Sequence, residues 1–197
     1  RLKIVSDSGA YLGNSTPSPP YRASHRIIGP YLTPNARVDV LGVVTNKPPT
    51  GAYRGAGGPE SAFCMERTVD LIARELDLDP AEVRRRNLIP PDAFPYLTPT
   101  GLTYDSGNYE VVLDRALEMA DYQGWREKAR QSRNSGGPWI GVGLATVIKM
   151  SGGSGESRTE EALIKIDPSG QTTAFTGISP HGQGSETSFA QIVADEI

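Results

Sequence analysis

The sequence predicts a mixed α+β chain made of parts of two adjoining subdomains. Apolar residues recur every three or four positions after Pro59, which is typical of a helix, and they alternate with polar ones over residues 36–45, which is typical of a strand. Helical patterns dominate before a glycine-rich stretch near residue 135, and strand patterns follow it. We therefore expect one subdomain over residues 1–134 and a second over residues 135–197.

Composition places the chain among globular proteins and excludes several classes of partner. Its 197 residues, 37% hydrophobic and 22% charged, allow a sizeable core. A net charge of -3 provides no basic field for nucleic acid or a membrane surface, and no apolar run reaches the ~20 residues of a membrane span. No secretory signal precedes the domain, so we expect a cytoplasmic protein. The single Cys64 and the distant His25 and His181 argue against a cysteine-built or zinc site, so any metal would arrive inside an organic cofactor.

The N-terminal segment predicts two strands around a proline-rich loop. Residues 1–13 form the first alternating run, with a bend at Gly9, and residues 36–45 form the second. Between them prolines are frequent and few apolar positions are periodic, so we expect a loop with a short helix near residues 21–28. Two consecutive prolines then end the second strand.

Two helices are expected to follow. The first begins with Pro59 and carries an apolar stripe that we expect to be buried. This stripe consists of Ala62, Met65, Val69, Ile72 and Leu76. Cys64 on the same helix is interpreted as a small buried thiol. Asp79 is the expected cap of the second helix, with Pro80 at its first position.

Three consecutive arginines, Arg84, Arg85 and Arg86, lie on the second helix. We interpret them as a solvated face with one or two carboxylate pairs. A contact with phosphate or with a partner is the alternative.

For the rest of the chain, we expect a proline-rich loop over residues 89–106, two helices, a linker, and then strands. The expected elements are helices over residues 109–120 and 124–131, a linker over 132–138, strands over 139–150, 162–166 and 172–176, a hairpin turn over 167–170 and a helix from Glu186. A glycine-rich loop over residues 151–155 is interpreted as a hairpin tip in preference to a phosphate contact.

Arg54 lies in a run of glycines immediately before the strongest helix start. Glycines let the backbone approach a ligand closely, and the N-terminal end of a helix is positively polarised. A guanidinium adds planar donors for phosphate or oxo groups. The sequence therefore predicts an anion site here, and a surface arginine beside a tight turn is the alternative. The loop is neither a P-loop nor a dinucleotide fingerprint, because the lysine and the spacing are missing.

A second glycine-bounded turn repeats this logic between Ser179 and Gly184. Gln183 can donate its amide N–H groups to an oxygen ligand near the helix that follows. A plain strand-to-helix turn is the alternative, and His181 alone is more typical of a structural histidine.

Three segments together resemble one known family in residues, order and spacing: residues 52–60 (AYRGAGGPE), 79–89 (DPAEVRRRNLI) and 181–191 (HGQGSETSFAQ). They resemble the large, molybdenum-binding subunit of the molybdenum hydroxylases, which include xanthine dehydrogenase, aldehyde oxidase and aerobic carbon monoxide dehydrogenase. The pattern is most similar to carbon monoxide dehydrogenase-like large subunits of the second form. The resemblance implies that residues 1–134 end a first molybdopterin-binding subdomain and that residues 135–197 begin a second.

The resemblance also implies a cofactor, partners and site residues. The cofactor is molybdopterin with molybdenum, as the cytosine dinucleotide in many bacterial members, and the partners are iron–sulfur and FAD subunits or domains. The family's arginine beside the metal and substrate pocket matches Arg54, and its cofactor-contacting glutamine matches Gln183. Backbone contacts with the cofactor match Gly55, Gly182 and His181.

Some positions depart from the family pattern. Copper-containing carbon monoxide dehydrogenases carry a cysteine where this chain has Gly55, which argues against copper and against carbon monoxide oxidation. Xanthine-oxidising members carry an aromatic residue where this chain has Ala56, and second-form loops commonly carry arginine where it has Gly58. These differences argue against a purine substrate and weaken the assignment to the second form.

Two functions remain open from the sequence. The first is a fragment of an enzyme that oxidises an aldehyde, an aromatic heterocycle or a similar small substrate with water as the oxygen source. The family's glutamate base and its first glutamine loop are missing, so we expect an internal fragment that is inactive alone, lacks the cofactor, and packs against the remainder of the large subunit. The second is a non-catalytic binding or assembly module that keeps the fold without the metal.

Overall fold

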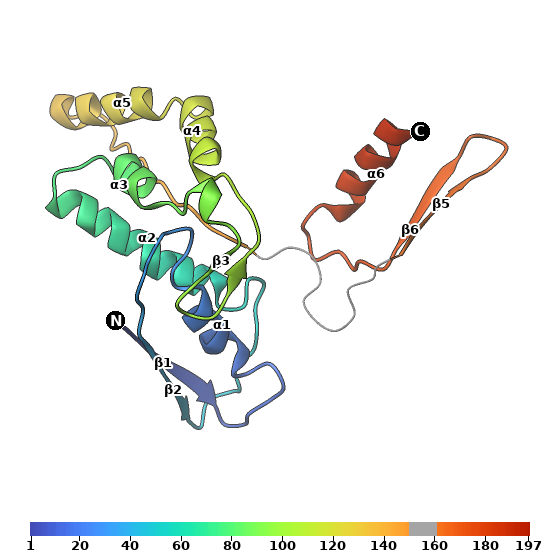
Figure 1. Cartoon of the computed structure of the whole chain (residues 1–197), viewed down its shortest axis with the longest axis horizontal. Coiled ribbons are helices and arrows are strands. Elements are labelled where there is room, and N and C mark those ends of the chain that lie inside the picture. The colour runs from blue at the N-terminus through green and yellow to red at the C-terminus, as the bar shows by residue number, and fades with distance from the viewer. Residues whose placement is uncertain (150–160) are drawn as a thin grey trace. The chain divides into compact units, whose positions relative to one another are not determined.

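The computed structural model describes residues 1–149 and 161–197, so the predicted glycine-rich loop over residues 151–155 lies outside the described residues. The chain divides into two compact units, Arg1–Lys149 and Met150–Ile197 (Figure 1). Both contain helices and strands, which confirms the predicted α+β class. Within the described ranges, no helix combines the length and the apolar character needed to cross a membrane.

A parallel pair of strands lies at the N-terminal side of the first unit. β1 (Leu2–Gly9) pairs with β2 (Val38–Val44), with Leu2 opposite Val38, so both predicted strands are confirmed. The connection between them contains α1 (Ser18–Arg26), as parallel pairing requires a crossover. Beyond β2, the Lys47 ammonium lies 2.7 Å from the Asp7 carboxylate and, with the Thr45 hydroxyl, lowers the pKa of Asp7 to about 2.

Two helices build the core of the first unit together with the chain around Tyr31. They are α2 (Gly58–Glu75) and α3 (Pro80–Asn87), as predicted. The Asp79 carboxylate caps α3 by accepting hydrogen bonds from the backbone N–H groups of Ala81 at 2.7 Å and Glu82 at 3.4 Å. The buried core consists of Tyr31, Val69, Ala73, Val83, Leu88 and Leu113.

The face that α2 buries differs from the predicted stripe. Val69 is buried, but Ile72 and Leu76 are 43% and 60% exposed, and Ala73 is buried in their place. Glu66, two turns before Ala73, is also buried because it binds polar groups from other segments. The helix is therefore rotated about its axis by these partners, and Cys64, expected to be buried, is exposed.

Leu76→Ala is accordingly expected to change the free energy of unfolding of this chain by less than about 0.5 kcal/mol, because the side chain is exposed. Leu113→Ala is the matched control, since the same truncation at a position that is 4% exposed should cost about 2–5 kcal/mol. Urea denaturation of both variants measures the difference. Equal losses would place Leu76 in the core.

The next elements surround this core. They are η1 (Pro91–Ala93), β3 (Tyr96–Leu97), β4 (Thr103–Tyr104), α4 (Tyr109–Met119) and α5 (Tyr122–Ser135). The predicted short helix within residues 124–131 is wrong in length, because Asp121 caps its start and Gly136, at φ 71°, ends it. The linker expected over residues 132–138 therefore begins inside α5.

The strand expected over residues 139–150 does not form in its described part, residues 139–149. This segment is instead part of the first unit and packs against its core: Leu144 contacts the core cluster, and the Thr146 N–H donates to Glu66 at 2.8 Å. Side chains of α2 and α3 thus form the hydrogen bonds to the backbone of this segment that a neighbouring strand would otherwise form. The subdomain boundary expected after residue 134 stays a prediction.

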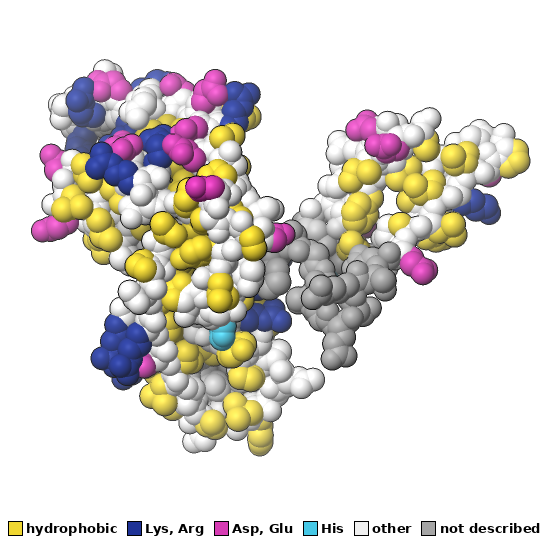
Figure 2. Space-filling model, in the orientation of Figure 1, with side chains coloured by type: hydrophobic (Ala, Val, Ile, Leu, Met, Phe, Trp, Pro, Cys, Tyr) yellow, Lys and Arg dark blue, Asp and Glu magenta, His cyan; other side chains and the backbone are white. Residues whose placement is uncertain are grey.

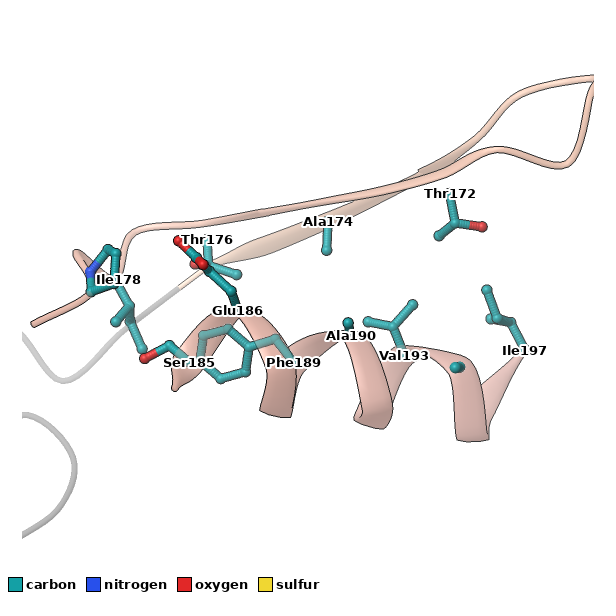
Figure 3. A pocket seen from close by; sticks show the side chains of 12 residues that line it. Thr172, Ala174, Thr176, Ile178, Ser185, Glu186, Phe189, Ala190, Val193 and Ile197 are labelled. Atoms are coloured by element: carbon teal, nitrogen blue, oxygen red, sulfur yellow. The ribbon is translucent and has the colours of Figure 1, made fainter. Parts of the chain in front are cut away.

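The second unit contains the predicted hairpin and the predicted final helix. β5 (Ala162–Ile166) and β6 (Thr172–Thr176) are antiparallel, and the Asp167 carboxylate orders their turn by accepting from the Ser169 N–H at 2.9 Å. α6 (Ser185–Glu196) follows. Phe189, Ala190 and Val193 face β6 across a groove of about 430 Å³ (Figure 3). None of the described residues of this unit is buried, and hydrophobic side chains gather on its surface (Figure 2).

Candidate functional site

The first predicted site is a tight turn directly before α2. The backbone N–H of Ala56 donates to the Tyr53 carbonyl at 2.7 Å, and that of Gly58 donates to the Gly55 carbonyl at 3.0 Å. Gly55, Ala56 and Gly57 have φ values of 102°, 42° and 88°, a left-handed run that glycine adopts most easily. The turn leaves Arg54 exposed, and α2 begins four residues later at Gly58.

Helix α1 holds this turn in place. A Cβ at Gly57 would lie 2.1 Å from the Pro19 carbonyl oxygen, so only glycine permits the observed approach of the two backbones. From the last residue of α1, the Arg26 guanidinium donates to the Gly55 carbonyl at 3.2 Å. No sequence pattern indicated Arg26, because its partner is a backbone oxygen that lies 29 residues away in the chain.

The second predicted site is the turn that leads into α6. The His181 N–H donates to the Oε1 atom of Gln183, and the Nε2 atom of Gln183 donates to the Ser179 carbonyl at 3.5 Å. Gly182 and Gly184 have φ values of 84° and 80°, and Gly184 caps α6. This turn brings His181, Gly182 and Gln183 together, all of them exposed.

The two turns belong to different units. Arg54 and Gly55 lie in the first unit, whereas His181, Gly182 and Gln183 lie in the second. Each turn is formed locally, and the convergence of all five residues on one ligand stays a prediction.

The arginine triplet on α3 divides into one buried, one half-buried and one exposed side chain. Arg84 is fully buried, so both interpretations of it as a surface residue are wrong. Its guanidinium lies 2.8 Å from the Glu66 carboxylate and 3.0 Å from that of Asp70, and it donates to the Leu144 carbonyl at 2.9 Å. Arg85 and Arg86 form the expected carboxylate pairs, both with Glu82 and the former also with Asp114.

Glu66 is the centre of this buried cluster. Besides Arg84, it accepts hydrogen bonds from the Tyr31 hydroxyl at 2.5 Å and from the Thr146 N–H at 2.8 Å. Burial and the neighbouring Glu66 raise the pKa of the Tyr31 hydroxyl, which therefore stays protonated as a donor. Every polar atom of the cluster has a partner, so it is a structural network and not a ligand site.

The donor set of the two turns fits an oxygen-rich organic group. A guanidinium and a primary amide supply N–H donors for phosphate, oxo or ring oxygen atoms. Among the residues that the structure describes, no group of three or more His, Cys, Asp or Glu could hold a metal ion.

Comparisons with known proteins identify two cofactor-binding domains in this chain. Models of the molybdopterin cofactor-binding domain match residues 1–88 and 115–197. The chain is 36% identical to the carbon monoxide dehydrogenase large chain of Hydrogenophaga pseudoflava, covering 100% of this chain and 26% of the relative. It is 33% identical to the nicotine 6-hydroxylase large subunit of Paenarthrobacter nicotinovorans, covering 86% of this chain and 21% of that protein.

A solved structure supports the same relationship. Quinoline 2-oxidoreductase from Pseudomonas putida 86 matches with a TM-score of 0.79 and 32% identity, covering 98% of this chain and 26% of that chain. The chain thus spans about a quarter of the length of these proteins. The two domain matches and the similarity of the fold show that the chain belongs to the molybdopterin cofactor-binding region of the molybdenum hydroxylase family.

Proposed function

We propose that this chain forms part of the cofactor and substrate site of a molybdenum hydroxylase that oxidises an aldehyde, an aromatic heterocycle or a similar small molecule, with water as the oxygen source. The exposed Arg54 on its glycine turn is the observation that carries the proposal. The resident group, molybdopterin with molybdenum and in its cytosine dinucleotide form, supplies the two-electron oxidation chemistry when bound.

The protein's own residues bind and orient. Arg54 directs a fixed positive charge toward an oxygen of the substrate or cofactor, which stabilises negative charge that develops there. Gln183 donates an amide N–H to the cofactor, and the backbones of Gly55, His181 and Gly182 approach it closely because the turns carry little side-chain bulk. Iron–sulfur and FAD partners receive the electrons, and the remainder of the large subunit supplies the base.

Gly55 narrows the range of substrates. It provides no sulfur ligand beside Arg54, so copper has no thiolate to bind at this position. This favours aldehyde or heterocycle oxidation over carbon monoxide oxidation, although a carbon monoxide dehydrogenase large chain is among the relatives.

Arg54→Ala in the full-length holoenzyme is expected to lower kcat/KM about 10–150-fold, because a charge-assisted hydrogen bond contributes about 1.5–3 kcal/mol. Activity is measured per bound molybdenum on a panel of aldehydes and heteroaromatic compounds. Arg74→Ala, which removes an exposed arginine near the other end of α2, should leave kcat/KM unchanged.

Two outcomes would contradict the proposal at different levels. An unchanged kcat/KM in Arg54→Ala would remove this residue from the site. A full-length protein purified without molybdenum and pterin, under conditions that load a related enzyme, would favour the non-catalytic module.

A further inference from the structure

Arg26 contacts the turn that carries Arg54. It is the last residue of α1, it is partly buried, and its Nη1 atom donates to the Gly55 carbonyl at 3.2 Å. The same carbonyl accepts the Gly58 N–H at 3.0 Å. The oxygen that follows Arg54 by one residue is therefore held from two directions, by a side chain of α1 and by the first residue of α2.

The turn also approaches α1 closely through backbone atoms at Gly57. Gly57 meets the Pro19 carbonyl and the Ala23 N–H, where an added Cβ would lie 2.1 and 2.7 Å away. These contacts prevent the turn from moving toward α1. They do not set the direction of the Gly55 carbonyl, because neither of them involves that atom. The hydrogen bond from Arg26 involves the carbonyl oxygen itself and therefore restrains its direction.

The charge of Arg26 is not directed to an acid. Across residues 1–149 and 161–197, no carboxylate forms an ion pair with Arg26, Arg22 or Lys149. Arg22 lies one turn earlier on α1, and the charges of Arg26 and Arg22, after desolvation, lower the pKa of Lys149. Arg26 therefore lies near two other cations, and within the described residues its guanidinium donates to a carbonyl oxygen and not to a carboxylate.

We propose that Arg26 is a positioning residue for Arg54. By fixing the Gly55 carbonyl, Arg26 sets the orientation of the Gly55–Ala56 peptide, one residue beyond Arg54, and so restrains the turn that keeps the Arg54 guanidinium aimed at the reacting oxygen. Arg26 touches neither substrate nor cofactor in this role. The inference rests on the proposed function, because it presumes that Arg54 acts at the site.

The test compares Arg26→Ala with Arg22→Ala in the full-length holoenzyme. Both variants remove one positive charge from α1, but only the first removes the bond to Gly55. We expect Arg26→Ala to lower kcat about tenfold, with molybdenum content and Tm close to the parent values, because small misplacements of a positioned group reduce rate strongly. Arg22→Ala should stay within about twofold of the parent, and Arg26→Lys, which keeps a charged donor, should recover part of the loss.

A double-mutant cycle separates positioning from a merely structural role. In the Arg54→Ala background, Arg26→Ala should have almost no further effect on kcat, because the group that it positions is gone. Two results would overturn the inference while leaving the role of Arg54 intact. In the first, the fold-losses in kcat of Arg26→Ala and Arg54→Ala multiply in the double variant. In the second, Arg26→Ala and Arg22→Ala lower kcat equally. If Arg54→Ala itself has no effect, the proposed function fails first, and the two failures are thereby distinguishable.

Discussion

Arg84→Ala is expected to destabilise the first unit by about 3–5 kcal/mol, because it leaves the carboxylate of Glu66 buried without its cationic partner. The arginine side chain is fully buried, and its guanidinium bonds Glu66, Asp70 and the Leu144 carbonyl. Helix α2 and the segment around Leu144, which are distant in sequence, therefore lose a shared partner at once. Replacing one member of such a pair costs more than the pair contributes, since the remaining charge stays desolvated.

Arg86→Ala is the matched control for this prediction. The same change two residues later removes a 60% exposed side chain whose ion pair with Glu82 is solvated, so the cost should be about 0–1 kcal/mol. Urea denaturation of the chain measures both values. A loss below about 1 kcal/mol in Arg84→Ala would mean that water enters the cluster and compensates Glu66.

Gly57→Ala is the second variant with a large expected effect, and it should lower the free energy of unfolding by about 2–5 kcal/mol. A left-handed residue with a side chain costs about 1–2 kcal/mol, and overpacking adds about 1–3 kcal/mol. At this position φ is 88°, and the new methyl group would lie 2.1 Å from the Pro19 carbonyl oxygen and 2.7 Å from the Ala23 nitrogen. Both obstacles are backbone atoms of α1, which cannot rotate away as a flexible side chain would.

Gly101→Ala separates the two contributions, because Gly101 also has φ 88° but no atom within 4 Å of an added Cβ. It should therefore show only the conformational cost of about 1–2 kcal/mol. Thermal and urea unfolding of both variants provide the comparison. If Gly57→Ala and Gly101→Ala lose equal amounts of unfolding free energy, α1 does not constrain the turn, and the close backbone contact at Gly57 does not add to the cost of the substitution.

Features that depend on a few neighbouring residues could be predicted from the sequence. Asp79 caps α3 and the Asp167 turn joins β5 to β6, because these hydrogen bonds close within four residues. The existence of α2, α3, α4 and α6 and of β1, β2, β5 and β6 follows from the hydropathy pattern in the same way, whereas the strand expected over residues 139–150 does not form in its described part. The glycine turns around Arg54 and Gln183 were also found, since their backbone geometry is required locally.

Which face a helix buries was decided only by the tertiary structure. Leu76 and Ile72 match a helical stripe, yet α2 turns toward Glu66 and Ala73 because Arg84, Tyr31 and the segment around Thr146 arrive from elsewhere in the chain. The burial of Arg84, the contact of Arg26 with Gly55 and the docking of residues 139–149 share this cause. A charged side chain is buried only where partners converge on it, and a pattern that spans a few turns of chain contains no information about partners that lie 18 to 80 residues away.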